Sequence, residues 1–151
     1  AEGKIREELL KQDLLEAVIG IGPNIFYGTP LAACVMVFKQ NKPAKKKGKV
    51  LFIDGSDQVR VGRAQNFLEP NHVKQLFDWY TNFKEIENYT KVASLKDIAE
   101  NDFNLNIPLY VEKVIEDNLP SVEVALADLK TAWDESLKAE EKFKTILKQF
   151  I

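Results

Sequence analysis

The strongest constraint on the fold of this chain comes from two apolar, partly β-branched runs, Leu14 to Ile21 and Leu31 to Phe38. Pro and Gly turn signals fill the connection between them, which is too short for the helical crossover that parallel strands require. The two runs are therefore predicted to pair as antiparallel neighbours in a sheet. A third run, Val50 to Asp54, is predicted to form another buried strand.

Helices are predicted around these strands, which makes the fold class α/β. The first covers Glu2 to Gln12, and a second is indicated over 71–83 by apolar residues at helical spacing, namely Val73, Leu76, Phe77, Tyr80 and Phe83. A short helix is expected at 94–99, where Ser94 and Asp97 form a near capping box. A long helix is expected over 121–150, after Pro120 and the capping residue Ser121.

The chain is expected to have two parts, a sheet part at 1–70 and a helical tail at 71–151. Charge differs between them: residues 1–70 carry a net charge of +3 and residues 71–151 carry −5, against −2 for the whole chain. The basic excess gathers in one loop, whose lysines are candidates for DNA phosphate contacts: Lys42, Lys45, Lys46, Lys47 and Lys49. The alternative is that these lysines are only solvated.

The sequence shows no complete motif for dinucleotide binding, metal binding or carboxylate catalysis. Gly20-x-Gly follows a strand, but the third glycine of a dinucleotide fingerprint is missing, because Ile25 stands there and no helix follows. His72 and Cys34 are the single histidine and the single cysteine, so no metal cluster is expected. His72 is predicted to lie on the surface and Cys34 to be a small core residue. No catalytic carboxylate pair is marked.

Phe26 and Tyr27 stand out because they lie between the end of one strand and a Gly-Thr-Pro turn. Loops at strand ends of α/β sheets commonly contact ligands, and an aromatic ring there can stack on a flat base. The alternative is that these rings plug the hairpin as core residues.

Several segments resemble the modification subunit of type I restriction–modification enzymes, which are adenine-N6 DNA methyltransferases. They are "AEGKIREELLKQDLLEAVIGIGPNIFYGTPLAACVMVFKQNK", "GKVLFIDGS", "GRAQNFL" and "NDFNLNIPLYV". The resemblance covers nearly the whole chain and matches the later part of such a subunit. It implies the terminal strands and helix of a Rossmann-like methyltransferase sheet, followed by a helical tail. It also implies that Phe26, or else Tyr27, stacks on an adenine extruded from the duplex.

The resemblance also shows what this chain lacks. The family's S-adenosylmethionine loop and Asn-Pro-Pro-aromatic motif lie upstream of the match, and no two prolines are adjacent here. We therefore expect a C-terminal fragment without catalytic residues, which alone neither binds S-adenosylmethionine nor methylates DNA. Pro30 stands where the family commonly has glycine, and Leu109 where it commonly has arginine. The rival interpretations are a stand-alone α/β interaction module without enzymatic activity and an independent nucleotide-binding domain.

The long terminal helix is expected to bind a partner through an apolar stripe. Its members are Leu126, Leu129, Trp133, Leu137, Phe143, Leu147 and Phe150. The resemblance suggests the specificity subunit as that partner, within a complex that also holds the restriction subunit. In isolation the chain is expected to form a weak homodimer. A single cysteine and the absence of an apolar run of about 20 residues fit a cytoplasmic protein without a membrane span.

Overall fold

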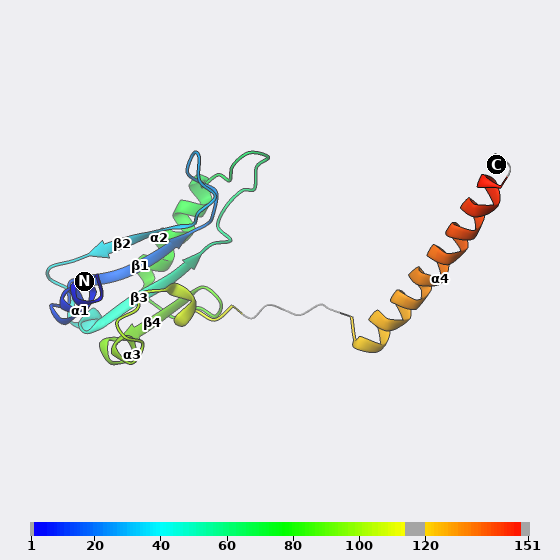
Figure 1. Cartoon of the computed structure of the whole chain (residues 1–151). Coiled ribbons are helices and arrows are strands. Elements are labelled where there is room, and N and C mark those ends of the chain that lie inside the picture. Colours follow the sequence, from blue (N-terminus) through cyan, green and yellow to red (C-terminus); the bar gives the residue numbers. More distant parts are fainter. Residues whose placement is uncertain (1, 114–119, 149–151) are drawn as a thin grey trace. The chain divides into compact units, whose positions relative to one another are not determined.

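A mixed four-stranded sheet with the strand order β2-β1-β3-β4 organises the first of two units (Figure 1). The computed structural model describes residues 2–113 and 120–148, and the chain divides into Ala1–Val114 and Ile115–Ile151. In the second unit the described residues form one helix, α4 (Val122–Leu147). The predicted α/β class is confirmed.

The sheet joins strands of both directions. β1 (Leu15–Ile21) pairs antiparallel with β2 (Ala33–Phe38) and parallel with β3 (Lys49–Gly55), which pairs antiparallel with β4 (Thr90–Ser94). The predicted antiparallel pairing of the first two runs is therefore confirmed. The parallel pairing has a consequence for the site: the segments that follow β1 and β3 leave the sheet at the same end of the strands.

The described part of the first unit contains three α-helices, the second and third of which begin at capping boxes. They are α1 (Glu2–Lys11), α2 (Pro70–Asn82) and α3 (Leu95–Glu100), with short 3-10 turns η1 (Ala44–Lys46) and η2 (Ile107–Leu109). Ser94 caps α3 by accepting a hydrogen bond from the Asp97 amide, 3.2 Å away, as its spacing predicts. At α2 the imidazole of His72 accepts a hydrogen bond from the Glu69 amide, so this histidine completes the capping box at the N-terminus of the helix.

Alternation along β3 produces two apolar clusters, because neighbouring side chains of a strand point to opposite faces. One cluster contains Leu10, Leu15, Val18, Val50, Phe52, Ala93, Ile98 and Val111, and the other contains Ala17, Leu51, Ile53, Leu76 and Trp79. β3 is thus covered on both faces, like the central strand of an α/β sheet.

The helix predicted over 71–83 is confirmed as α2, in which Leu76 and Trp79 are buried and Val73 and Phe77 are exposed. Two local features differ from the sequence-based expectation. Residues 71–113 belong to the sheet unit, because β4 pairs with β3 and the first unit extends to Val114. The prediction that Cys34 is a core residue was wrong: it lies exposed on β2, an edge strand with sheet on one side only.

A buried carboxylate ties the lysine loop to the sheet and to α2. Glu16 is wholly buried and accepts hydrogen bonds from Lys46 (2.9 Å) and the Tyr80 hydroxyl (2.8 Å). Burial opposes ionisation of Glu16, but these two bonds and the positive charges of Lys46 and Lys39 together outweigh it and hold the pKa of the carboxyl below its ordinary value. Burial and the bond to Glu16 raise the pKa of Tyr80 to about 12.

We predict that Glu16→Gln lowers the free energy of unfolding by about 1–3 kcal/mol at pH 7, because a charge-assisted network is lost. The lowered pKa of Glu16 stabilises the fold above the carboxyl range, and this contribution disappears as pH falls through it. The difference between wild type and variant, measured by denaturant unfolding, should therefore shrink from pH 7 to pH 3. The exposed Glu100→Gln serves as control, and an equal effect of both variants would contradict the account.

Candidate nucleic-acid interface

The aromatic pair lies on a closed loop, residues 22–32, between β1 and β2. The Asn24 amide donates a hydrogen bond to the Pro30 carbonyl (3.3 Å), and the Thr29 amide donates one to the Phe26 carbonyl (3.4 Å). Gly28 turns the chain at a φ of +78°, which glycine adopts without a steric penalty. The turn chemistry of the sequence thus builds a compact projecting loop.

Both aromatic rings reach the surface of the loop. Tyr27 is 97% exposed and Phe26 is 51% exposed. Neither belongs to the two apolar clusters, so the hairpin is not held together by a buried aromatic plug. Exposed rings of this size at a strand end offer flat apolar surfaces that a base can cover.

A second loop, residues 56–69, docks onto the first. It follows β3, so the parallel pairing brings both loops to one edge, where Figure 1 shows them projecting together. Asn66 joins them twice, since its amide donates to the Asn24 carbonyl (2.7 Å) and its side chain to the Pro23 carbonyl (2.9 Å). Sequence analysis treated the second segment only as a loop and missed this contact.

Glycine is required where the two loops meet. A Cβ atom at Gly22 would lie 2.5 Å from Val59 Cγ1 and 2.7 Å from the Ser56 carbonyl oxygen. A Cβ at Gly20 would lie 2.8 Å from Ile107 Cδ1. The Gly-x-Gly motif therefore serves close packing of the protein on itself.

The lysine loop, residues 39–48 with Lys49 at the start of β3, connects β2 to β3 at the opposite end of the strands. Two of its candidate residues are engaged inside the fold: Lys42 is 5% exposed and bonds Asp13 Oδ1 at 2.6 Å, and Lys46 bonds Glu16. The other three, Lys45, Lys47 and Lys49, are exposed. The structure thus places the predicted base-stacking and phosphate-binding residues at opposite ends of the strands.

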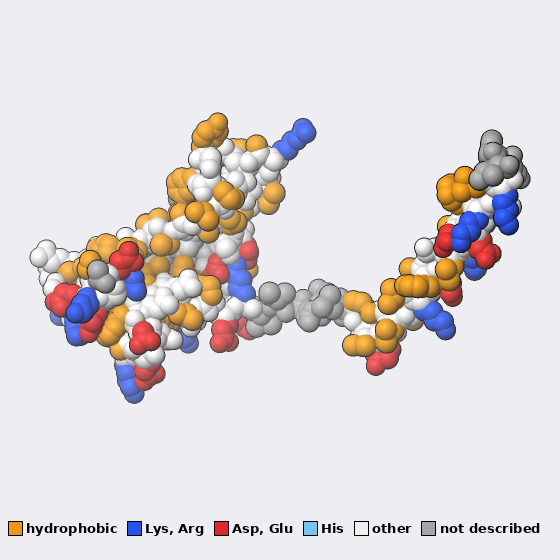
Figure 2. Space-filling model, in the orientation of Figure 1, with side chains coloured by type: hydrophobic (Ala, Val, Ile, Leu, Met, Phe, Trp, Pro, Cys, Tyr) orange, Lys and Arg blue, Asp and Glu red, His pale blue; other side chains and the backbone are white. Residues whose placement is uncertain are grey.

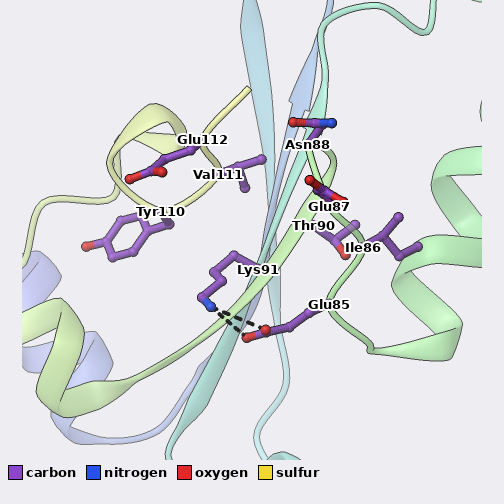
Figure 3. A pocket seen from close by; sticks show the side chains of 9 residues that line it. All are labelled: Glu85, Ile86, Glu87, Asn88, Thr90, Lys91, Tyr110, Val111 and Glu112. Carbon is purple, nitrogen blue, oxygen red and sulfur yellow. Dashed lines mark hydrogen bonds and ion pairs between the residues drawn. The ribbon is translucent and has the colours of Figure 1, made fainter. Parts of the chain in front are cut away.

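A hollow of 520 Å³ beside β4 carries mainly acidic side chains at its rim (Figure 3). Its carboxylates are Glu85, Glu87 and Glu112, and the one lysine, Lys91, forms an ion pair with Glu85 at 3.2 Å. Such a rim disfavours the binding of phosphates. Within the described ranges, no group of three or more His, Cys, Asp or Glu side chains is arranged to hold a metal ion.

The family model for N-6 DNA methylases matches residues 1–118. The chain belongs to this family. It is 35% identical, over 99% of its length, to the MjaVII methylase subunit, a type I restriction enzyme subunit of Methanocaldococcus jannaschii, of which the match covers 25%. The resemblance to type I modification subunits is therefore confirmed. The chain spans about a quarter of the length of the curated relatives it matches.

Solved structures agree with this assignment. The methyltransferase subunit of a type I restriction–modification system from Streptococcus thermophilus superposes with a TM-score of 0.68 at 36% identity, over 74% of this chain and 23% of that one. A chain from a structure describing complex assembly and conformational transition of the type I system covers 99% of this chain and 33% of that one. Its TM-score of 0.51 at 15% identity shows a shared fold.

The helix α4 presents its apolar side chains without burying any of them among the described residues of its unit. The six predicted docking residues that the structure describes are 40–65% exposed, namely Leu126, Leu129, Trp133, Leu137, Phe143 and Leu147. The seventh, Phe150, lies outside the described residues. Charged residues are distributed along the whole length of α4. In the described part of the chain, no helix is long and apolar enough to cross a membrane.

We predict that Gly22→Ala loosens the contact between the two loops, because the added methyl group overlaps Val59 and the Ser56 carbonyl. Overpacking of this kind costs about 1–3 kcal/mol. Hydrogen exchange should show faster exchange of the Asn66 amide, and thermal unfolding should occur at a lower temperature. Gly3→Ala in α1, where the nearest atom is the Arg6 side chain at 3.8 Å, is the control. Unchanged protection of Asn66 would contradict the loop-docking interpretation.

Proposed function

We propose that this chain works as the base-binding and subunit-docking part of a type I adenine-N6 DNA methyltransferase subunit. The observation that carries the proposal is the exposed pair Phe26 and Tyr27 on a closed loop, in a chain of the N-6 DNA methylase family. A methyltransferase must extrude its target adenine from the duplex before the exocyclic amino group can react. An exposed aromatic ring compensates the base for part of its lost stacking.

The chemical step belongs to the remaining part of the methylase. The chain has no Asn-Pro-Pro motif, and its Gly20-x-Gly22 motif is filled by its own side chains and backbone. S-adenosylmethionine, the methyl donor of the proposed reaction, would therefore bind outside this chain. We derive only a positioning role for Phe26 and Tyr27, and we expect no methylation by the isolated chain. The proposed site of action is the cytoplasm.

The exposed lysines support a second, sequence-independent contact. Lys45, Lys47 and Lys49 are available for phosphate binding, whereas Lys42 and Lys46 stabilise the fold through Asp13 and Glu16. Their position at the far edge of the sheet means that they would bind DNA away from the target base. A duplex that reaches both edges would have to run along the strands.

We predict that Phe26→Ala in the intact methylase lowers the rate of DNA methylation by about 5- to 150-fold, because base stacking contributes about 1–3 kcal/mol per base. The melting temperature should change little, since half of this side chain is already in water. Phe77→Ala, which removes a 62% exposed ring from α2, is the matched control and should leave methylation intact. If the Phe26 variant melts early but its folded fraction methylates normally, the ring is structural and the proposal fails.

The helix α4 is proposed to dock on the specificity subunit. Its 26 residues span about 39 Å, longer than a small domain needs, and the apolar side chains follow one another at steps of mostly three or four. A stripe of this kind is stable in water only when another helix or sheet covers it. The similar fold of a chain from an assembled type I system supports a partner subunit as the cover. The restriction subunit is proposed to join the same complex.

We predict that the double substitution Trp133→Ala and Leu137→Ala abolishes co-purification with the specificity subunit, because two exposed apolar anchors are removed. The control, Lys130→Ala with Glu135→Ala, changes exposed charged residues on the same helix and should bind at full yield. Without the partner, the wild-type chain should dimerise weakly in sedimentation experiments, and the apolar double variant should stay monomeric. Full-yield pairing of the Trp133/Leu137 variant would contradict docking through this stripe.

A further inference from the structure

The loop 56–69 is held at a fixed position relative to the aromatic loop. Besides the two bonds made by Asn66, the Asn24 side chain donates to the Ala64 carbonyl at 3.4 Å. The Arg60 and Phe67 backbones bond each other in both directions at 2.9 Å, which closes the loop at its base. The backbone next to Arg63 is therefore tied, through Ala64 and Asn24, to the loop that carries Phe26.

The charges of this loop are distributed unevenly between its base and its tip. The acids that flank the loop lie at its base and have partners there. Asp57 shares Lys113 with Asp54, at 2.7 and 3.4 Å, and Glu69 pairs with Arg60. Residues 58–68 contain no acidic side chain, and residues 22–32 contain no charged one. In a chain with a net charge of −2, the two loop tips together carry a local positive charge.

The two arginines of the loop have different surroundings. Arg60 packs over the Phe67 ring at 4.3 Å and pairs with Glu69, so it is part of the loop's own structure. Arg63 is exposed and makes no ion pair or hydrogen bond with any described residue. In Figure 2 the outermost part of the projection shows hydrophobic and basic side chains and no acidic ones.

We infer that the loop 56–69 is a second DNA-binding element, in which Arg63 binds a phosphate of the strand next to the extruded adenine. The inference rests on the proposed function and gives a role to Arg63, a residue of the segment "GRAQNFL" to which the sequence analysis assigned none. The planar guanidinium donates two parallel hydrogen bonds to phosphate oxygens, which fixes the backbone in direction as well as position. An enzyme that removes a base from the stack needs the flanking backbone held in this way.

The test measures DNA affinity of the intact methylase at several salt concentrations, using a duplex that contains the target site. Arg63→Gln should weaken binding about five- to tenfold and reduce the slope of log K against log salt by about one, because one phosphate contact is lost. Arg63→Lys should keep most of the slope, since its charge remains. Lys74→Gln removes the same charge from an exposed lysine of α2 and should change neither quantity.

A modified duplex locates the contact. Neutral methylphosphonates beside the target adenine should weaken wild-type binding as much as Arg63→Gln does, and combining the two changes should cause no further loss. Additive losses, or a slope for Arg63→Gln equal to that of Lys74→Gln, would overturn the inference and point to an acidic protein partner instead. If Arg63→Gln shows the expected loss of affinity and slope but Phe26→Ala still methylates DNA normally, base stacking is refuted and the phosphate contact stands. If the wild-type methylase does not bind DNA, both proposals are refuted.

Discussion

The parallel pairing of β1 with β3 is the interaction on which the candidate site depends. Ile21 lies opposite Gly55, so the two strands end at the same level and release their loops side by side. β2 then returns antiparallel from the first loop, which sets Phe26 and Tyr27 at the tip of a hairpin. The two loops then contact each other, because Asn66 donates a hydrogen bond to the Pro23 carbonyl and Gly22 has no side chain to hold them apart. One strand register thus determines which residues the two loops present together at this end of the sheet.

The sequence predicted the individual elements of the sheet better than their spatial relations. The runs ending at Ile21 and Phe38 formed strands because their apolar and β-branched residues suit a buried sheet, and their short connection forced an antiparallel hairpin. β4 escaped prediction because Thr90–Ser94 is short and contains Lys91 and Ser94, so it lacks the apolar run of a buried strand. The exposed Cys34 was mistaken for core since composition does not show which strand lies at an edge.

The candidate site could be predicted only in part. Phe26 and Tyr27 were visible as adjacent aromatics at a strand end, and the structure places both at the surface. The lysine cluster could be recognised in the sequence. Only the structure distinguishes Lys42, which is buried and paired with Asp13, from exposed neighbours such as Lys45. Arg63 was not identified because its relation to Phe26 arises from the pairing of β1 and β3, and a periodicity within one segment carries no information about the next.

The central claim, that the loop 22–32 receives the extruded base, is tested most directly by photocross-linking in the intact methylase. A duplex with 5-iodouracil in place of the target adenine is irradiated in the complex, and the cross-linked peptide is sequenced by mass spectrometry. The account predicts an adduct on Phe26 or Tyr27, because an iodinated base reacts with the aromatic ring on which it stacks. An adduct confined to other segments of this chain, with none in residues 22–32, would contradict it.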